Sequence, residues 1–156
     1  MNPLARLNSE FAEPRPTWVA HWEHFIHASG MGVRGYGRTL DETFAQAALA
    51  TTALIVEPHR IAARGALNLE CRAPDASRLL INWLHMLGAE IAGRKHVFCA
   101  FDVHITGQHL HAIAWGEPLV VVRHSPAANL DAAIFMAARV VRDGSDGWMA
   151  ECAVEF

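Results

Sequence analysis

The sequence contains no apolar run that approaches the roughly 20 residues needed to span a membrane. Its first segment, Met1–Thr17, carries Glu10 and Glu13 and has no apolar core, so it is not typical of a signal peptide. We therefore expect a cytoplasmic protein without membrane association. A chain of 156 residues suits one domain with a substantial core. We predict a flexible arm over residues 1–19 and a single domain over residues 20–156.

Cysteine is also scarce. Cys71, Cys99 and Cys152 are far apart and form no C-x-x-C motif, which argues against a disulfide framework. Their apolar neighbours favour small core residues over a redox role. An excess of positive charge is absent as well, because 13 basic residues stand against 16 acidic ones and the net charge is −3. We therefore expect no strong direct binding of nucleic acid through a broad basic surface.

Two helices are indicated by their start signals and by apolar residues at helical spacing. Thr39 stands three residues before Glu42, which is the spacing of a capping box, and an apolar face continues to Ile55. Pro58 ends this helix. Pro74 and Asp75 open the second helix, whose buried face is formed by leucines and Trp83, and which ends near Gly88 or Gly93.

Strands are indicated by alternation of apolar and polar residues. The glycines of residues 30–37 predict a strand that passes close to another backbone. Alternation over 61–71, 97–105 and 148–156 predicts three more strands. Residues 130–141 are ambiguous, because their alanines favour a helix by propensity.

A turn at Thr106-Gly107 predicts a hairpin from residue 97 to residue 115. With that turn, His104 lies opposite His109, and Asp102 lies opposite His111. Three imidazoles and a carboxylate then share one sheet face, and such groups are good ligands for zinc or nickel. A solvated sheet face that happens to be rich in histidine remains the alternative interpretation.

Five segments in order resemble the archease family. The sequence FIHASGMGVRGYG at 25–37 is similar to the family's F-x-H-T-A-D-x-G-[IV]-x-A-x-G, and TLDETF at 39–44 is similar to its next helix start. LLINWL at 79–84 matches its LL-x-x-[WF]-L helix. GEP at 116–118 matches its GEP corner, with Arg-His following at 123–124.

The resemblance covers about residues 20–156 and implies an α+β fold, with a mixed β-sheet and two main helices packed on one side. It also implies that residues 130–141 form a strand. Archeases are accessory proteins of the RtcB-type RNA-splicing ligase, and they promote its guanylylation and turnover in tRNA splicing and RNA repair. The implied partner is therefore an RNA ligase, and the chain itself is not expected to be an enzyme. The oligomeric state is not implied.

The family's metal site is partly rewritten in this chain. The Asp of its H-T-A-D motif is replaced by Gly30, whereas Glu155 retains a carboxylate at the penultimate position and Phe156 supplies a terminal carboxylate. Oxygen ligands of this kind suit a calcium-like divalent cation. His27 stands where the family has its own histidine and is a further candidate ligand. The family's K-A-V-T-Y-H segment is DAAIFM here, so Asp131 and Met136 replace its Lys and His.

Three functions follow as hypotheses. The first is an archease-like cofactor that activates an RNA ligase. The second is a degenerate archease scaffold that acts as a chaperone-like protein-binding module with another partner. The third is a small metal-binding protein, or metalloenzyme, that uses the histidine face.

Overall fold

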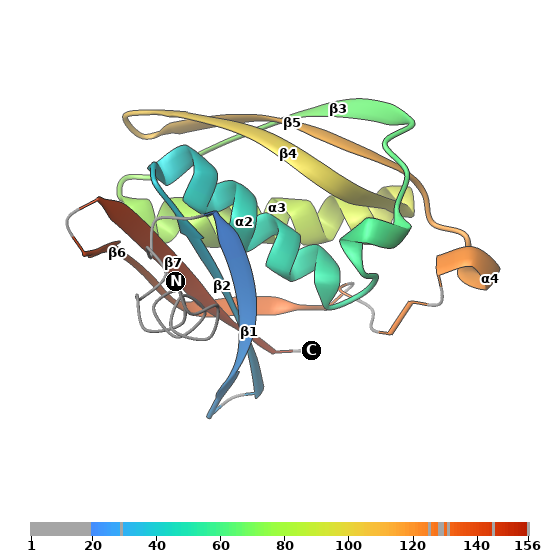
Figure 1. The fold of residues 1–156 in the computed structure, drawn as a ribbon, viewed down its shortest axis with the longest axis horizontal. Coiled ribbons are helices and arrows are strands. Elements are labelled where there is room, and N and C mark those ends of the chain that lie inside the picture. The colour runs from blue at the N-terminus through green and yellow to red at the C-terminus, as the bar shows by residue number, and fades with distance from the viewer. Residues whose placement is uncertain are drawn as a thin grey trace, which may run out of the picture.

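Two β-sheets enclose a layer of two long helices (Figure 1). The computed structural model describes residues 20–28, 30–124, 126–127, 130, 132–144 and 146–155. The four-stranded sheet has the order β1 (His21–His27), β2 (Gly30–Gly37), β7 (Gly147–Glu155) and β6 (Ile134–Asp143). The three-stranded sheet has the order β3 (Gly65–Arg72), β5 (His109–Pro118) and β4 (His96–Thr106).

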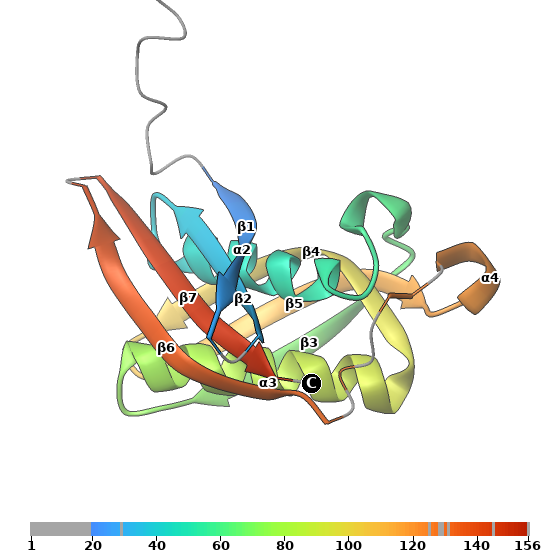
Figure 2. The ribbon, with the colours of Figure 1, turned by 90° about the horizontal axis from the view of Figure 1, so that it is seen from below.

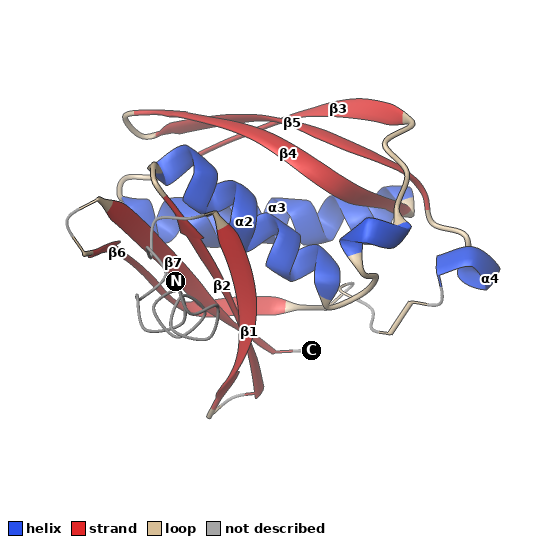
Figure 3. Cartoon of the chain, viewed as in Figure 1, coloured by secondary structure: helices blue, strands red, loops and turns tan. Residues whose placement is uncertain are grey.

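The helices α2 (Leu40–Ala53) and α3 (Ala76–Arg94) lie between the sheets, and the short η1 (Pro58–Arg60) and α4 (Val121–His124) lie in connections. Figure 3 shows this alternation of sheet, helix layer and sheet by colour. The α+β class is therefore confirmed. The single mixed sheet is corrected to two antiparallel sheets, with the helices on the inner side of each. In the described part of the chain no helix is long and apolar enough to cross a membrane.

Helix α2 begins as the sequence predicts. The Thr39 hydroxyl accepts a hydrogen bond from the Glu42 N–H at 3.1 Å, and the Glu42 carboxylate accepts one from the Arg38 N–H at 2.8 Å. These contacts satisfy backbone donors that the first turn leaves unpaired. Two opposite sides of the helix are buried, and small residues such as Ala47 and Ala50 on them are fully covered.

Close approach of α2 to β2 requires the glycines predicted at this strand. A Cβ atom on Gly35 would lie 2.4 Å from the Ala47 nitrogen and 2.5 Å from the Thr43 carbonyl oxygen. No side chain fits at such distances, so the strand and the helix backbone meet directly. The prediction that this strand passes close to another backbone is confirmed.

Helix α3 begins at the Asp75 cap, whose carboxylate accepts a hydrogen bond from the Arg78 N–H at 2.9 Å. It continues past Gly88 and ends at Arg94, where Lys95 takes a left-handed conformation with φ of 55°. Gly88 is therefore not a helix end. A Cβ there would lie 3.5 Å from the Phe135 ring, an ordinary packing distance, so α3 passes close to β6 at this position.

The predicted register of the β4–β5 hairpin is wrong by two residues. Thr106 pairs with His109, so Gly107 and Gln108 form the turn and His104 lies opposite His111. Gly107 has φ of 60°, a conformation that suits glycine and places it inside the turn. A shift of two residues keeps Asp102, His104, His109 and His111 on their predicted face. Phe98, by contrast, is buried, because the register shifts by one residue between Phe98 and Ala100.

Residues 134–143 form strand β6, as the resemblance implies and against the helical propensity of their alanines. The strand pairs with β7, and the buried Phe135 side chain packs toward α3. The register shifts between Met136 and Arg139, where Ala137 has φ of 53°. Tertiary pairing therefore outweighs a local preference worth only tenths of a kcal/mol per residue.

Candidate functional site

The candidate ligands His27 and Glu155 meet Gly30, which replaces the family's Asp, at one end of the four-stranded sheet. His27 pairs with Gly30, and Met31 pairs with Val154, so the register places Glu155 beside Gly30. We call these three residues the end row. His27 and Gly30 belong to the β1–β2 hairpin, which extends past the helix layer in Figure 1, and the end of β7 lies beside this hairpin in Figure 2. Glu155 is exposed and His27 is half-buried. Phe156 lies outside the described residues.

Gly30 differs from an ordinary strand residue in its backbone. Its φ is +134°, a conformation that side chains of L-amino acids rarely adopt. The sequence has glycine in place of the family's Asp at this position, and the local backbone conformation also disfavours an Asp there. In the described part of the chain, no group of three or more His, Cys, Asp or Glu side chains is arranged to hold a metal ion.

Next to the end row, four charged side chains cross the outer face of the sheet, one on each strand. We call Glu23, Arg34, Glu151 and Arg139 the charge row. Glu23 pairs with Arg34, and Arg34 with Glu151, in the strand register. Arg34 contacts a Glu23 oxygen at 2.8 Å and a Glu151 oxygen at 2.7 Å. Arg139 contacts the other Glu151 oxygen at 2.8 Å.

The signs alternate along this row, so it is neutral overall and joins all four strands. Glu151 is its most buried member, with 11% of its side chain exposed. Burial raises the pKa of Glu151, but hydrogen bonds from Arg34 and Arg139 outweigh burial and hold the pKa below its ordinary value. The hydrogen bond from Arg34 likewise lowers the pKa of Glu23.

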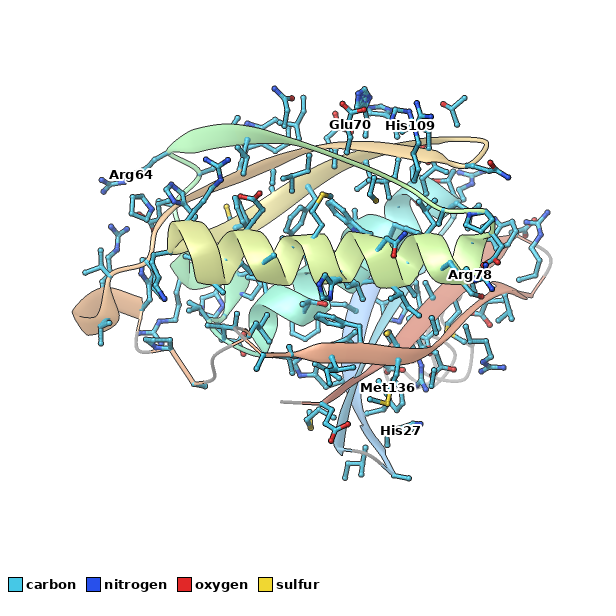
Figure 4. The ribbon with its side chains drawn as sticks, turned by 180° about the vertical axis from the view of Figure 1, so that it is seen from behind. His27, Arg64, Glu70, Arg78, His109 and Met136 are labelled. Atoms are coloured by element: carbon cyan, nitrogen blue, oxygen red, sulfur yellow. The ribbon has the colours of Figure 1, made fainter. Side chains whose placement is uncertain are left out.

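Aromatic side chains cover the strand between the charge row and the end row. The Phe25 ring lies over Gly32, where a Cβ atom would be 2.2 Å from the ring. The Arg34 guanidinium carbon lies 4.2 Å from the centre of the same ring, a cation–π contact. Met136 stands on the same outer face, as Figure 4 shows together with His27. Phe25 therefore fixes Arg34 and backs the hairpin that carries His27.

A second polar cluster lies at the predicted GEP corner. Glu117 is 3% exposed, and its carboxylate accepts hydrogen bonds from the Ala62 N–H at 2.7 Å and from His124 at 3.0 Å. Arg123 and Arg64 lie 3.1 and 3.4 Å from its other oxygen. The hydrogen bond from Ala62, followed by that from His124, lowers the pKa of Glu117.

The tautomer of His124 follows from its partners. The Val120 N–H donates to Nδ1 at 2.8 Å, so Nδ1 carries no proton and Nε2 donates to Glu117. His124 is completely buried. The pair therefore closes the connection after β5 as a structural clamp and has no open position for a substrate.

The four predicted side chains of the histidine face lie on the outer side of the three-stranded sheet. His109 and His111 have ring centres 5.3 Å apart, and Asp102 lies 3.3 Å from His104. Glu70, which the sequence did not single out, lies 2.8 Å from His109. Figure 4 shows Glu70 and His109 close together above the sheet. The shared face is confirmed, while its use for metal stays a prediction.

All three cysteines are free thiols. Burial raises the pKa of Cys71 to about 11 and that of Cys152 to about 12, so both stay protonated near neutral pH. Burial also raises the pKa of Cys99. A reactive thiolate is therefore not available at these positions.

The charge row was missed because its four members come from distant parts of the chain. Each one stands on a strand that alternates, so the sequence predicts a solvent-facing polar residue there. The missing information is which strands lie beside each other. A partial signal was present at Arg34, which is the one charged residue of the glycine-rich segment 30–37.

Comparisons with known proteins agree with this fold. The sequence profile of the Archease protein family (MTH1598/TM1083) matches residues 22–155. Protein archease of Pyrococcus abyssi (strain GE5 / Orsay) is 32% identical over 137 residues, or 85% of this chain and 96% of the relative. Protein archease of Methanosarcina acetivorans is 26% identical over 146 residues, or 90% and 99%. The solution structure of Methanobacterium thermoautotrophicum protein 1598 shares the fold, with a TM-score of 0.68, 22% identity and coverage of 86% and 98%.

Proposed function

Because the chain belongs to the archease family, we propose that it is an accessory protein that activates an RNA-splicing ligase of the RtcB type. It promotes guanylylation of the ligase and its turnover by direct contact. The observation that carries this proposal is the match of the family along residues 22–155, which includes the end-row residues on all three of their strands, β1, β2 and β7. The partner is therefore a protein, and the chemistry belongs to that partner.

The contact surface in this proposal is the end of the four-stranded sheet. Support comes from two apolar side chains beside the end row, since Ile26 is 91% exposed and Ile134 is 56% exposed. Ile134 pairs with Glu155 across the strands, and Ile26 precedes His27. A carboxylate flanked by exposed aliphatic groups on a projecting hairpin suits a protein interface with an apolar centre and a polar rim.

Glu155 is the residue to which we assign the family's cation role. With the terminal carboxylate of Phe156 it offers oxygen ligands to a calcium-like divalent cation, and His27 is the third candidate. Such a site is weak, because two oxygen sources leave most of the coordination shell to water. Its function is to present a cation, or the carboxylates themselves, to the ligase.

The test is a ligase guanylylation assay with GTP and manganese, with and without this protein. The native chain is expected to accelerate formation of the ligase–GMP adduct. Glu155→Gln is expected to lower that acceleration by roughly 10- to 100-fold, the range seen when a metal site loses a supporting group. Glu70→Gln is the matched control, because Glu70 is an exposed carboxylate on the other sheet. Equal acceleration by Glu155→Gln and the native chain contradicts the role of Glu155.

A second candidate is an archease scaffold that has changed its partner. The conformation of Gly30 favours it, because the backbone at this position has become suited to glycine and not to an acidic ligand. In this case the folded native protein leaves the rate of ligase guanylylation unchanged. That outcome contradicts activation of the ligase and supports the reassigned scaffold.

A further inference from the structure

A pocket lies at one end of the three-stranded sheet, on a different sheet from the end row. Its volume is about 280 Å³, close to the lower end of ligand pockets, which hold roughly 300–1,000 Å³. Three basic side chains line it, and so do apolar ones: Arg64, Arg94, His96, Leu67, Phe98 and Pro118. None of its lining residues carries a carboxylate side chain.

The hollow lies beside Gly65 of β3, where an added Cβ atom would meet nothing within 4 Å. Gly65 pairs with Gly116 of β5, and both line the pocket. At Gly116 an added Cβ would lie 1.8 Å from the Val97 carbonyl oxygen, so the backbone of β4 closes that side of the hollow. Phe98, which is 2% exposed, pairs with Gly116 and forms the floor.

The two arginines stand at the mouth, where they are 67% and 60% exposed. Within the described residues, Arg64 pairs through Nε with Glu117, and Arg94 pairs through Nε with Glu90. The two terminal nitrogens of each guanidinium therefore stay available as donors. Figure 4 shows Arg64 at the far end of the sheet from Glu70 and His109.

This arrangement selects a ligand with a flat apolar body and an anionic group. The apolar floor accepts one ring, and two guanidiniums at the mouth match the oxygens of a phosphate. The C-terminus of α3 disfavours an anion at the same place, so the guanidiniums have to hold the charge.

We propose that this pocket binds a nucleoside monophosphate, with the base against Phe98 and the phosphate between Arg64 and Arg94. The nucleotide is either free or the end of a single-stranded RNA, since both carry the same ring and phosphate. The inference does not depend on the proposed function, because it concerns another surface of the molecule.

Isothermal titration of the full-length protein with GMP and AMP tests the proposal. We expect one saturable site for a nucleotide and at least about tenfold weaker binding of guanosine and of ribose 5-phosphate, because each lacks one half of the recognised ligand. A short RNA with a terminal phosphate that displaces GMP identifies the strand end as a source, and failure to displace it identifies the free nucleotide. Absence of saturable binding by any nucleotide overturns the proposal.

Gly65→Leu tests the location, because a Cβ at Gly65 meets no atom within 4 Å and the side chain can fill the hollow. Gly93→Leu is the matched control, since its Cβ also meets open space and Gly93 does not line the pocket. Gly65→Leu is expected to abolish binding, and Gly93→Leu to preserve it. Arg64→Gln and Arg94→Gln are each expected to weaken binding about tenfold. Unchanged binding by a folded Gly65→Leu variant, checked by circular dichroism, overturns the assignment.

Discussion

Glu151 links strands on the outer face of the four-stranded sheet, because it contacts two arginines from different strands. Arg34 on β2 and Arg139 on β6 both donate to its carboxylate. With the carboxylate mostly buried, removal of its charge leaves both guanidiniums without their main partner.

We predict that Glu151→Gln lowers the free energy of unfolding at pH 7 by about 1–3 kcal/mol. The pKa of Glu151 is lowered in the folded state, so its stabilising effect is present above the ordinary value of 4.5 and is lost as the pH falls below it. The difference between native and variant should therefore shrink between pH 7 and pH 3. Urea unfolding at several pH values measures it. Glu155→Gln is the control and should change stability by less than about 0.5 kcal/mol; a difference independent of pH contradicts the prediction.

Gly30 gives a second prediction for a single residue. Asp at this position restores the residue of the family motif but must adopt φ of +134°. We predict that Gly30→Asp lowers stability by about 1–3 kcal/mol through backbone strain. Gly30→Asn should cost the same, because the strain does not depend on charge. Thermal unfolding of both variants, with and without calcium, measures the change in stability. A Gly30→Asp variant that is more stable than the native protein contradicts the strain argument.

The contact of β2 with α2 depends on the absence of a side chain at Gly35. Ala50, Ala47 and Thr43 make the facing side of the helix, and the Gly35 position lies against its backbone. The helix cannot move away from β2, because β4 of the other sheet packs against its opposite side. Added volume at such a close contact destabilises the folded state.

We predict that Gly35→Ala lowers the free energy of unfolding by about 1–3 kcal/mol, as overpacking does in other cores. Gly65→Ala is the control for the same substitution in a strand, since its added Cβ meets no atom within 4 Å. That variant should stay within about 1 kcal/mol of the native protein. If both variants lose the same free energy of unfolding, the replacement of glycine itself determines the loss of stability, and the close approach of β2 to α2 does not.

The whole molecule holds together through its helix layer. Each sheet covers one side of the helices, and Trp83 of α3 donates to the Phe44 carbonyl of α2 at 3.0 Å within that layer. Both sheets pack against these helices within one cluster of buried apolar residues. Loss of the helix layer therefore exposes both sheets at once.

We predict one cooperative unfolding transition in urea. Tryptophan fluorescence and far-ultraviolet circular dichroism should give the same midpoint, because helices and both sheets unfold together. Amides of β2, β5 and α3 should exchange with solvent at similar rates in native-state hydrogen exchange. Two separate midpoints, or protection confined to one sheet, contradict this prediction.

The sequence by itself determined the local elements and the family. Caps at Thr39 and Asp75 depend on residues three positions apart, and strand faces depend on alternation, so both are readable along the chain. The motifs at 25–37 and 116–118 likewise indicate the family. The assignment of a cation site to Glu155, Phe156 and His27 stays a prediction.

Only the tertiary structure decided which strands lie side by side. The division into two antiparallel sheets, the charge row and the pocket at Arg64 each join residues that are far apart in sequence. β6 became a strand because pairing with β7 and packing on α3 outweighed its alanines. Such choices depend on free energies of packing between distant segments, and no local pattern contains them.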